Sequence, residues 1–165
     1  MNCFFSILLF LIAISNVHAQ TKAGYNCWEF LEWGTDSATV SSLVKKKGRE
    51  IRYPNALNAR FRYQDLNTWL DYDSTKKLQT VKQRIAFSAH EQKQANETYE
   101  KIRTRMLTDY GRPRIEMRDT LECNTHIYWD LKHTKIHLEY DYQYKIIDEF
   151  GAGSYWVEII FEKAD

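Results

Sequence analysis

The sequence has few of the residues that interrupt regular structure, with only two prolines and six glycines in 165 residues. It contains no low-complexity tract and no Pro-, Gly- or Ser-rich stretch of the kind that links domains. The motifs Gly-x-Ser-x-Gly and His-Glu-x-x-His are absent, as are phosphate-binding and calcium-binding loops. These absences predict one compact unit without a familiar catalytic signature, and we expect no cofactor and assign no metal site.

The only long apolar run extends from Phe4 to Ile14 and is followed by Val17-His18-Ala19, which has small residues where a signal peptidase cleaves. The run has about 11 residues, whereas a membrane-spanning helix needs about 20. We therefore predict a signal peptide over residues 1–19 and a single α+β domain over residues 20–165. The mature chain is expected to be secreted or periplasmic, without membrane insertion after cleavage.

Cysteine is also scarce. Cys3 lies in the predicted signal peptide, which leaves Cys27 and Cys123 in the mature chain. In an oxidising compartment an even count favours a disulfide, and two cysteines allow only one pairing. The alternative is two reduced, buried thiols.

The net charge of +1 conceals an uneven distribution, because residues 119–165 carry four basic and ten acidic side chains. This acidic segment disfavours nucleic acid and favours either a protein partner with a basic surface or a cation. The alternative is that these charges are simply the solvated faces of strands.

The most regular pattern lies between Lys135 and Lys145. Apolar and aromatic residues fall on one parity and polar residues on the other, which is typical of a half-buried strand in an antiparallel sheet. The inward set is Ile136, Leu138, Tyr140, Tyr142 and Tyr144; the outward set is His137, Glu139, Asp141 and Gln143.

Similar signals predict the other elements. A helix should begin after Thr35 or Asp36 and end at Gly48, and a second should run from about Gln94 to Tyr110, ending before Gly111 and Pro113. Alternation predicts strands at about 59–63, 68–72, 81–87, 114–118, 126–131 and 156–162. The glycines of Gly151-Ala152-Gly153-Ser154 indicate a bend over 146–153 that forms a hairpin connection.

The predicted fold is α+β, with antiparallel sheet and two main helices packed on one side. The pattern suggests two helix-plus-meander pseudo-repeats, at 28–90 and 91–165, neither of which would bury a large core alone.

The chain resembles the beta-lactamase inhibitor protein, and small secreted bacterial proteins of no known function, in this tandem helix-plus-sheet layout. The resemblance is carried by Ala19-Gln20, by Trp33-Gly34 before a helix, by the segment from Tyr110 to Pro113 after one, and by Trp129 leading into Lys135–Leu138. These are packing and turn signatures, so they imply a layout and no active or binding residues.

The best catalytic candidates are His137, Glu139 and Asp141, which lie on one face of the predicted strand. Alternate residues of a strand are about 6.5–7 Å apart, a separation that suits an acid and a base flanking a water molecule. His133 would join them in a metal-binding row if the strand began early. The alternative is an ordinary solvent-facing strand.

The aromatic residues offer a second candidate. Tyr140, Tyr142 and Tyr144, with Trp129 or Trp156, would form a stacking platform for sugars or bases if they were uncovered. The alternative is that the tyrosines belong to the core. The favoured function is a non-catalytic, protein-binding or inhibitor-like module; the alternatives are a hydrolase or metal-binding protein using strand 135–145, and a structural envelope protein.

Overall fold

The computed structural model describes residues 27–51, 58–63, 66–119, 124–147 and 150–165. In this part of the chain, a two-stranded hairpin and two α-helices accompany a seven-stranded antiparallel sheet. The elements in chain order are β1 (Cys27–Trp28), β2 (Leu31–Glu32), α2 (Ser37–Lys46), β3 (Asn58–Tyr63), β4 (Leu66–Tyr72), β5 (Leu78–Ser88), the 3₁₀ turn η1 (Ala89–Glu91), α3 (Gln92–Tyr110), β6 (Ile115–Asp119), β7 (Asn124–Asp130), β8 (Thr134–Ile147) and β9 (Phe150–Lys163).

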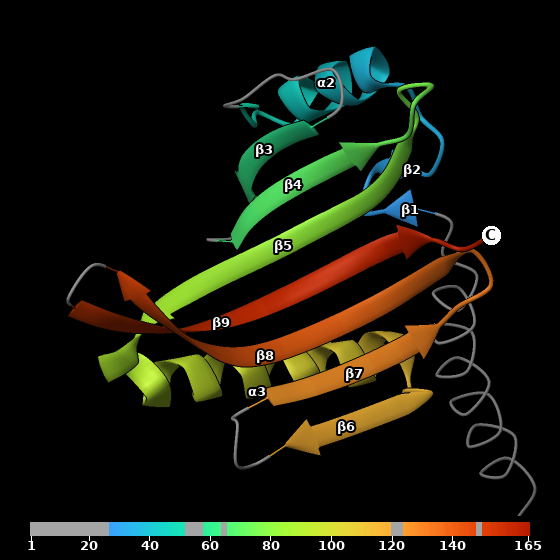
Figure 1. The fold of residues 1–165 in the computed structure, drawn as a ribbon. Coiled ribbons are helices and arrows are strands. Elements are labelled where there is room, and N and C mark those ends of the chain that lie inside the picture. Colours follow the sequence, from blue (N-terminus) through green and yellow to red (C-terminus); the bar gives the residue numbers. More distant parts are fainter. Residues whose placement is uncertain (1–26, 52–57, 64–65, 120–123, 148–149) are drawn as a thin grey trace, which may run out of the picture.

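The large sheet has the strand order β3-β4-β5-β9-β8-β7-β6. Each helix is followed by an antiparallel meander: α2 by β3, β4 and β5, and α3 by β6 to β9. The two meanders join where β5 pairs with β9, from Thr80 opposite Glu162 to Ser88 opposite Ser154. The α+β class and the helix-plus-meander arrangement predicted from the sequence are thus confirmed (Figure 1).

Helix α2 begins and ends as the sequence predicts. The carboxylate of Asp36 accepts a hydrogen bond from the backbone N–H of Thr39 at 3.0 Å, so that it caps the free amides of the first turn. Gly48 follows the last turn with a φ of +69°, a conformation that glycine adopts without steric cost. Val40 and Val44, four residues apart, are fully buried and attach the helix to the core.

Helix α3 covers the sheet. It lies behind the strands in Figure 1, and it contacts β5 and β9. Its buried residues are Ala95, Tyr99 and Met106, whose spacing places them on one stripe. Gly111, with a φ of +76°, ends the helix at the predicted position. Both helices contribute to one hydrophobic core, which lies on a single face of the sheet.

The core is built from alternate residues of neighbouring strands. In the register of the sheet, Leu70 lies opposite Val81, Val81 opposite Phe161 and Phe161 opposite Ile136, and all four are buried. Because the side chains of a strand alternate between faces, the residues between these positions point to the other face. The alternation at 135–145 predicted that Ile136, Leu138 and Tyr140 point inward, and all three are buried.

The N-terminal hairpin closes one end of the core. Trp28 and Leu31 are buried, and the indole N–H of Trp33 donates to the hydroxyl of Thr134 at 2.8 Å. The backbone N–H of Gly34 also donates to the carbonyl of Leu78. These contacts connect the start of the described chain to both halves of the sheet.

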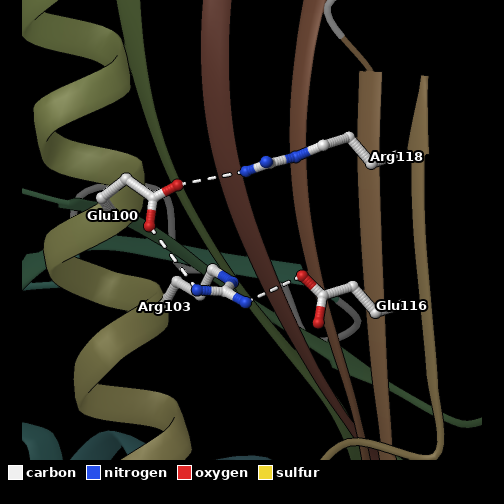
Figure 2. A network of polar contacts seen from close by, with 4 residues as sticks. All are labelled: Glu100, Arg103, Glu116 and Arg118. Atoms are coloured by element: carbon white, nitrogen blue, oxygen red, sulfur yellow. Dashed lines mark hydrogen bonds and ion pairs between the residues drawn. The ribbon is translucent and has the colours of Figure 1, made fainter. Parts of the chain in front are cut away.

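Strand β6 is fastened to α3 by alternating charges (Figure 2). Arg103 of α3 is 2.9 Å from Glu116 and 3.7 Å from Glu100, and Glu100 is 3.3 Å from Arg118. Arg103 and Glu100 come from the helix, whereas Glu116 and Arg118 come from the strand. This ionic chain holds the outermost strand of the second half against the helix.

One expectation about the loops is wrong. Gly151, Ala152, Gly153 and Ser154 lie within β9, paired with β8, and do not form a hairpin connection. A Cβ at position 153 would collide with the ring of Tyr142, so the glycine allows that ring to cross the strand. Cys123 and the side chain of Cys27 lie outside the described residues, so their pairing stays a prediction.

Candidate functional site: the uncovered face of the sheet

The face of the sheet opposite α3 carries no helix in the part of the chain that the structure describes (Figure 1). We call it the open face and define it by the outward residues of β4 to β9. These are Asn67, Trp69, Asp71, Thr80, Lys82, Arg84, Ile115, Met117, Asp119, Asn124, His126, Tyr128, Asp130, Lys135, His137, Glu139, Asp141, Trp156, Glu158, Ile160 and Glu162.

Two histidines meet on this face where β7 pairs with β8. The register of the sheet sets Tyr128 of β7 opposite His137 of β8, and His126 of β7 opposite Glu139 of β8. Nδ1 of His126 and Nε2 of His137 are 2.9 Å apart, a hydrogen-bond distance at which one ring N–H donates to the other nitrogen. The ring of Tyr128 stacks on that of His137 with centroids 4.3 Å apart, which fixes its plane.

Glu139 completes a group of three half-buried side chains with His126 and His137. One ligand-type atom from each of them lies within 4.8 Å of the other two. Asp141, the third candidate from the sequence, is outside this group. His133 is exposed and precedes β8, which begins at Thr134, so it does not extend the row.

The surroundings of the group shift the pKa of His137 and of Glu139. Burial, and to a lesser degree the neighbouring His126, lowers the pKa of His137 to about 4, so its imidazole is neutral at pH 7. Burial also raises the pKa of Glu139, as do the charges of Glu158 and Asp141, whereas His126 and Arg84 act in the opposite direction. The group therefore offers a neutral imidazole next to a carboxyl group in an acidic neighbourhood.

A charged pair lies beside the histidines. Arg84 of β5 is 2.9 Å from Glu158 of β9, directly across the joint between the two meanders. The guanidinium also lies 4.5 Å from the ring centroid of Trp156. The Glu158 side chain is only 9% exposed and the Arg84 side chain 37%, so Arg84 supplies the charge that this nearly buried carboxylate needs.

Next to His137 the open face is hollowed. A depression of about 410 Å³ has Tyr128, His137 and Ile160 among its lining residues. Charged residues of both signs also line it, namely Arg114, Asp130, Lys135 and Glu162. The hollow thus places charged groups of both signs around one aromatic ring, one imidazole and an aliphatic side chain.

The residues of the predicted aromatic platform do not share one face, because Tyr140 and Tyr142 lie on the core side of the sheet and Trp156 on the open face. Tyr140 is 6% exposed and stacks on Tyr99 of α3 at 5.2 Å, so it cannot stack on a ligand. Tyr142 is half-buried and packs against Tyr155 at 4.6 Å between centroids. The side chain of Tyr144 lies outside the described residues. Trp156 lies on the open face, beneath Arg84.

His126 was not among the site residues predicted from the sequence. Its parity, opposite to that of the inward Ile127 and Trp129, was a usable signal that it points outward. Its proximity to His137 depends on the β7–β8 register, which the local pattern does not specify.

Protein-family models, curated proteins and solved structures were compared with this chain. None matches it. The resemblance to the beta-lactamase inhibitor protein therefore stays an expectation from the sequence. In the described residues no helix combines the length and apolar character that crossing a membrane requires.

Proposed function

We propose that this protein is a secreted or periplasmic, non-catalytic binding module that holds a protein partner with a basic surface on its open face. The single observation that carries the proposal is the composition of that face. Aromatic and aliphatic side chains are interspersed on it with charged ones, among which acidic side chains outnumber basic ones. Export is supported by the composition of residues 1–19.

The excess of acidic side chains on the open face indicates a partner with a basic surface. The acidic residues of this face are Asp71, Asp119, Asp130, Glu139, Asp141, Glu158 and Glu162, and its basic residues are Lys82, Arg84 and Lys135, with Arg114 reaching it from the residue before β6. Complementary charge favours binding of a basic protein and speeds its encounter.

The apolar residues supply the area that such an interface needs. Ile115 and Met117 of β6 are 37% and 50% exposed, the two large hydrophobic residues with substantial exposure in the described chain. Both belong to the open face, since Ile115 pairs with Tyr128 and Met117 with His126. They add exposed apolar area along the edge strand β6, and Ile160 of β9 adds apolar area in the hollow. Apolar and aromatic side chains of this kind supply much of the area that protein interfaces bury.

A charge-reversal experiment tests the proposal. The double variant Asp130→Lys/Glu162→Lys changes two charged residues that line the hollow, and the matched variant Glu32→Lys/Glu97→Lys makes the same change of net charge away from the open face. Each protein is immobilised, and the secreted and envelope fractions of the source cells are passed over it at low and high salt. Captured proteins are identified and their affinities measured.

We expect a basic protein to be retained by the wild type and by the Glu32/Glu97 variant, and to be released by salt. The Asp130/Glu162 variant should bind it at least about tenfold more weakly, equivalent to about 1.4 kcal/mol. Equal capture by both variants, or no retained protein with the wild type, would contradict the proposal.

A further inference from the structure

We propose that His126, His137 and Glu139 form a binding site for a first-row transition-metal ion of the Zn²⁺ class. The inference is independent of the protein partner proposed above, because it rests on the geometry of three side chains within one chain. Two imidazole nitrogens and one carboxylate oxygen converge from neighbouring strands, and their ligand-type atoms all lie within 4.8 Å of one another. Two histidines and one carboxylate form a donor set that binds zinc in catalytic sites.

The distances are close to those of a loaded site. Zinc lies about 2.0–2.1 Å from imidazole nitrogen, so two nitrogens of a tetrahedral site are roughly 3.3 Å apart. Nδ1 of His126 and Nε2 of His137 are 2.9 Å apart. To hold an ion, the two nitrogens need to separate by a few tenths of an ångström and the rings to turn so that both lone pairs face it. The carboxylate of Glu139, whose oxygen lies within 4.8 Å of these nitrogens, has to close on the same point.

The supporting residues favour the bound arrangement. Both histidines lie on paired, adjacent strands, and Tyr128 stacks on His137, so the rings lose little conformational freedom on binding. Glu139 shares its strand face with Asp141 and lies opposite Glu158 on β9, whose charge is offset by Arg84, so the carboxylates of Glu139 and Asp141 are the negative charges that attract a cation. Burial of the three side chains is intermediate, which leaves them accessible to solvent.

The three donor atoms also indicate which metal ions the site would bind and how many coordination positions the protein would fill. Imidazole nitrogen suits zinc, copper, nickel and iron, whereas magnesium and calcium require sites built from oxygen ligands. Three protein donors leave at least one position of a four-coordinate ion for water or for another ligand. His137 lines the 410 Å³ hollow, so the ion would lie next to space that such a ligand can enter.

Calorimetric titration of the purified, untagged protein with ZnCl₂ tests the site, with MgCl₂ as the ion that should not compete. The ligand variants are His126→Asn, His137→Asn and Glu139→Gln. The matched control is His133→Asn, which removes an exposed histidine outside the group. A Cys27→Ser/Cys123→Ser variant removes the two thiols of the predicted mature chain as an alternative source of binding.

We expect one Zn²⁺ per chain in the wild type, the His133 variant and the cysteine variant. Each ligand variant should bind at least about 100-fold more weakly, because even loss of an outer partner of a metal ligand costs roughly 10- to 100-fold. The ring NMR signals of His126 and His137, and not that of His133, should shift on binding. Thermal unfolding without metal shows whether each variant folds, and the Zn²⁺-dependent rise in Tm should be absent from the folded ligand variants.

The absence of stoichiometric binding to the wild type would overturn the proposal. So would undiminished binding by Glu139→Gln together with unshifted His126 and His137 signals. Binding lost from the His133 or cysteine variant would assign the ion to a different place on the chain and would also overturn it.

Discussion

The stability of the folded protein should depend on the ion pair of Arg84 and Glu158, which joins β5 to β9 where the two meanders meet. Replacing Arg84 with methionine keeps much of the side-chain volume and removes the charge. It also leaves Glu158, whose side chain is 9% exposed, without the guanidinium that lies 2.9 Å away. An unpaired carboxylate in this position is poorly solvated, so the folded state should be destabilised.

The expected magnitude is about 2–3 kcal/mol. A hydrogen bond to a charged group contributes about 1.5–3 kcal/mol, and the cation–π contact with Trp156 about 0.5–1 kcal/mol at an exposed site. The upper ends of these ranges do not apply, because the Arg84 side chain is 37% exposed and water screens part of the interaction. For a domain of this size the loss corresponds to a fall in Tm of roughly 4–12 °C.

The chain contains a matched control. Arg114 and Asp130 form an ion pair of similar length, 2.8 Å, but their side chains are 60% and 43% exposed. Arg114→Met should therefore cost less than about 1 kcal/mol. Urea unfolding of both variants measures the difference, and the double variant Arg84→Met/Glu158→Gln should be less destabilised than the sum of its single changes. If Arg84→Met costs no more than Arg114→Met, the argument from burial is wrong.

Two predictions concern pH. Burial raises the pKa of Tyr72 and Tyr99 to about 12, above the unfolded value of 10.0, so their contribution to stability is complete below pH 10 and is lost as the pH rises toward 12. An absorbance titration should find at least two late-ionising tyrosines, and Tyr99→Phe should reduce the loss of stability at alkaline pH. Ionisation of all tyrosines near pH 10 while the protein is folded would contradict this. A hydrogen bond from the backbone N–H of Thr39 holds the pKa of Asp36 below 3.8, and one from the backbone N–H of Lys77 does the same for Asp73. The contribution of these two carboxylates to the stability of the fold is therefore present above pH 3.8 and is lost as the pH falls through their pKa in the folded state. Asp36→Asn keeps a side chain that can cap the helix but removes its charge. Urea unfolding midpoints measured between pH 2 and 7 should therefore fall less steeply at acid pH for this variant than for the wild type. An equally steep fall would contradict the contribution of the Asp36 carboxylate.

Much of the fold could be predicted because its signals are local. Asp36 and Gly48 mark the ends of α2, and Gly111 marks the end of α3, since capping depends on residues next to the helix end. The alternation at 135–145 separated buried Leu138 from half-buried Glu139 for a similar reason. The same local logic failed at Gly153, where the pairing of two 14-residue strands overrides the turn preference of glycine.

The candidate site could be predicted only in part, because it depends on pairing between strands. The alternation placed His137 and Glu139 on one face, but His126 joins them only in the observed register of β7 and β8. A shift of one residue would turn His126 to the core side of the sheet. The acidity of residues 119–165 was visible in the sequence, whereas its concentration on one face required the strand order.

The pairing of β5 with β9 has a consequence for biogenesis. Strand β5 emerges from the ribosome long before β9, and until then one side of β5 has no neighbour from the finished sheet. A strand edge exposed in this way is open to pairing with other molecules. Folding of this sheet should therefore be slow compared with that of a protein built from local contacts, and a chaperone that shields the unpaired edge of β5 should improve its yield.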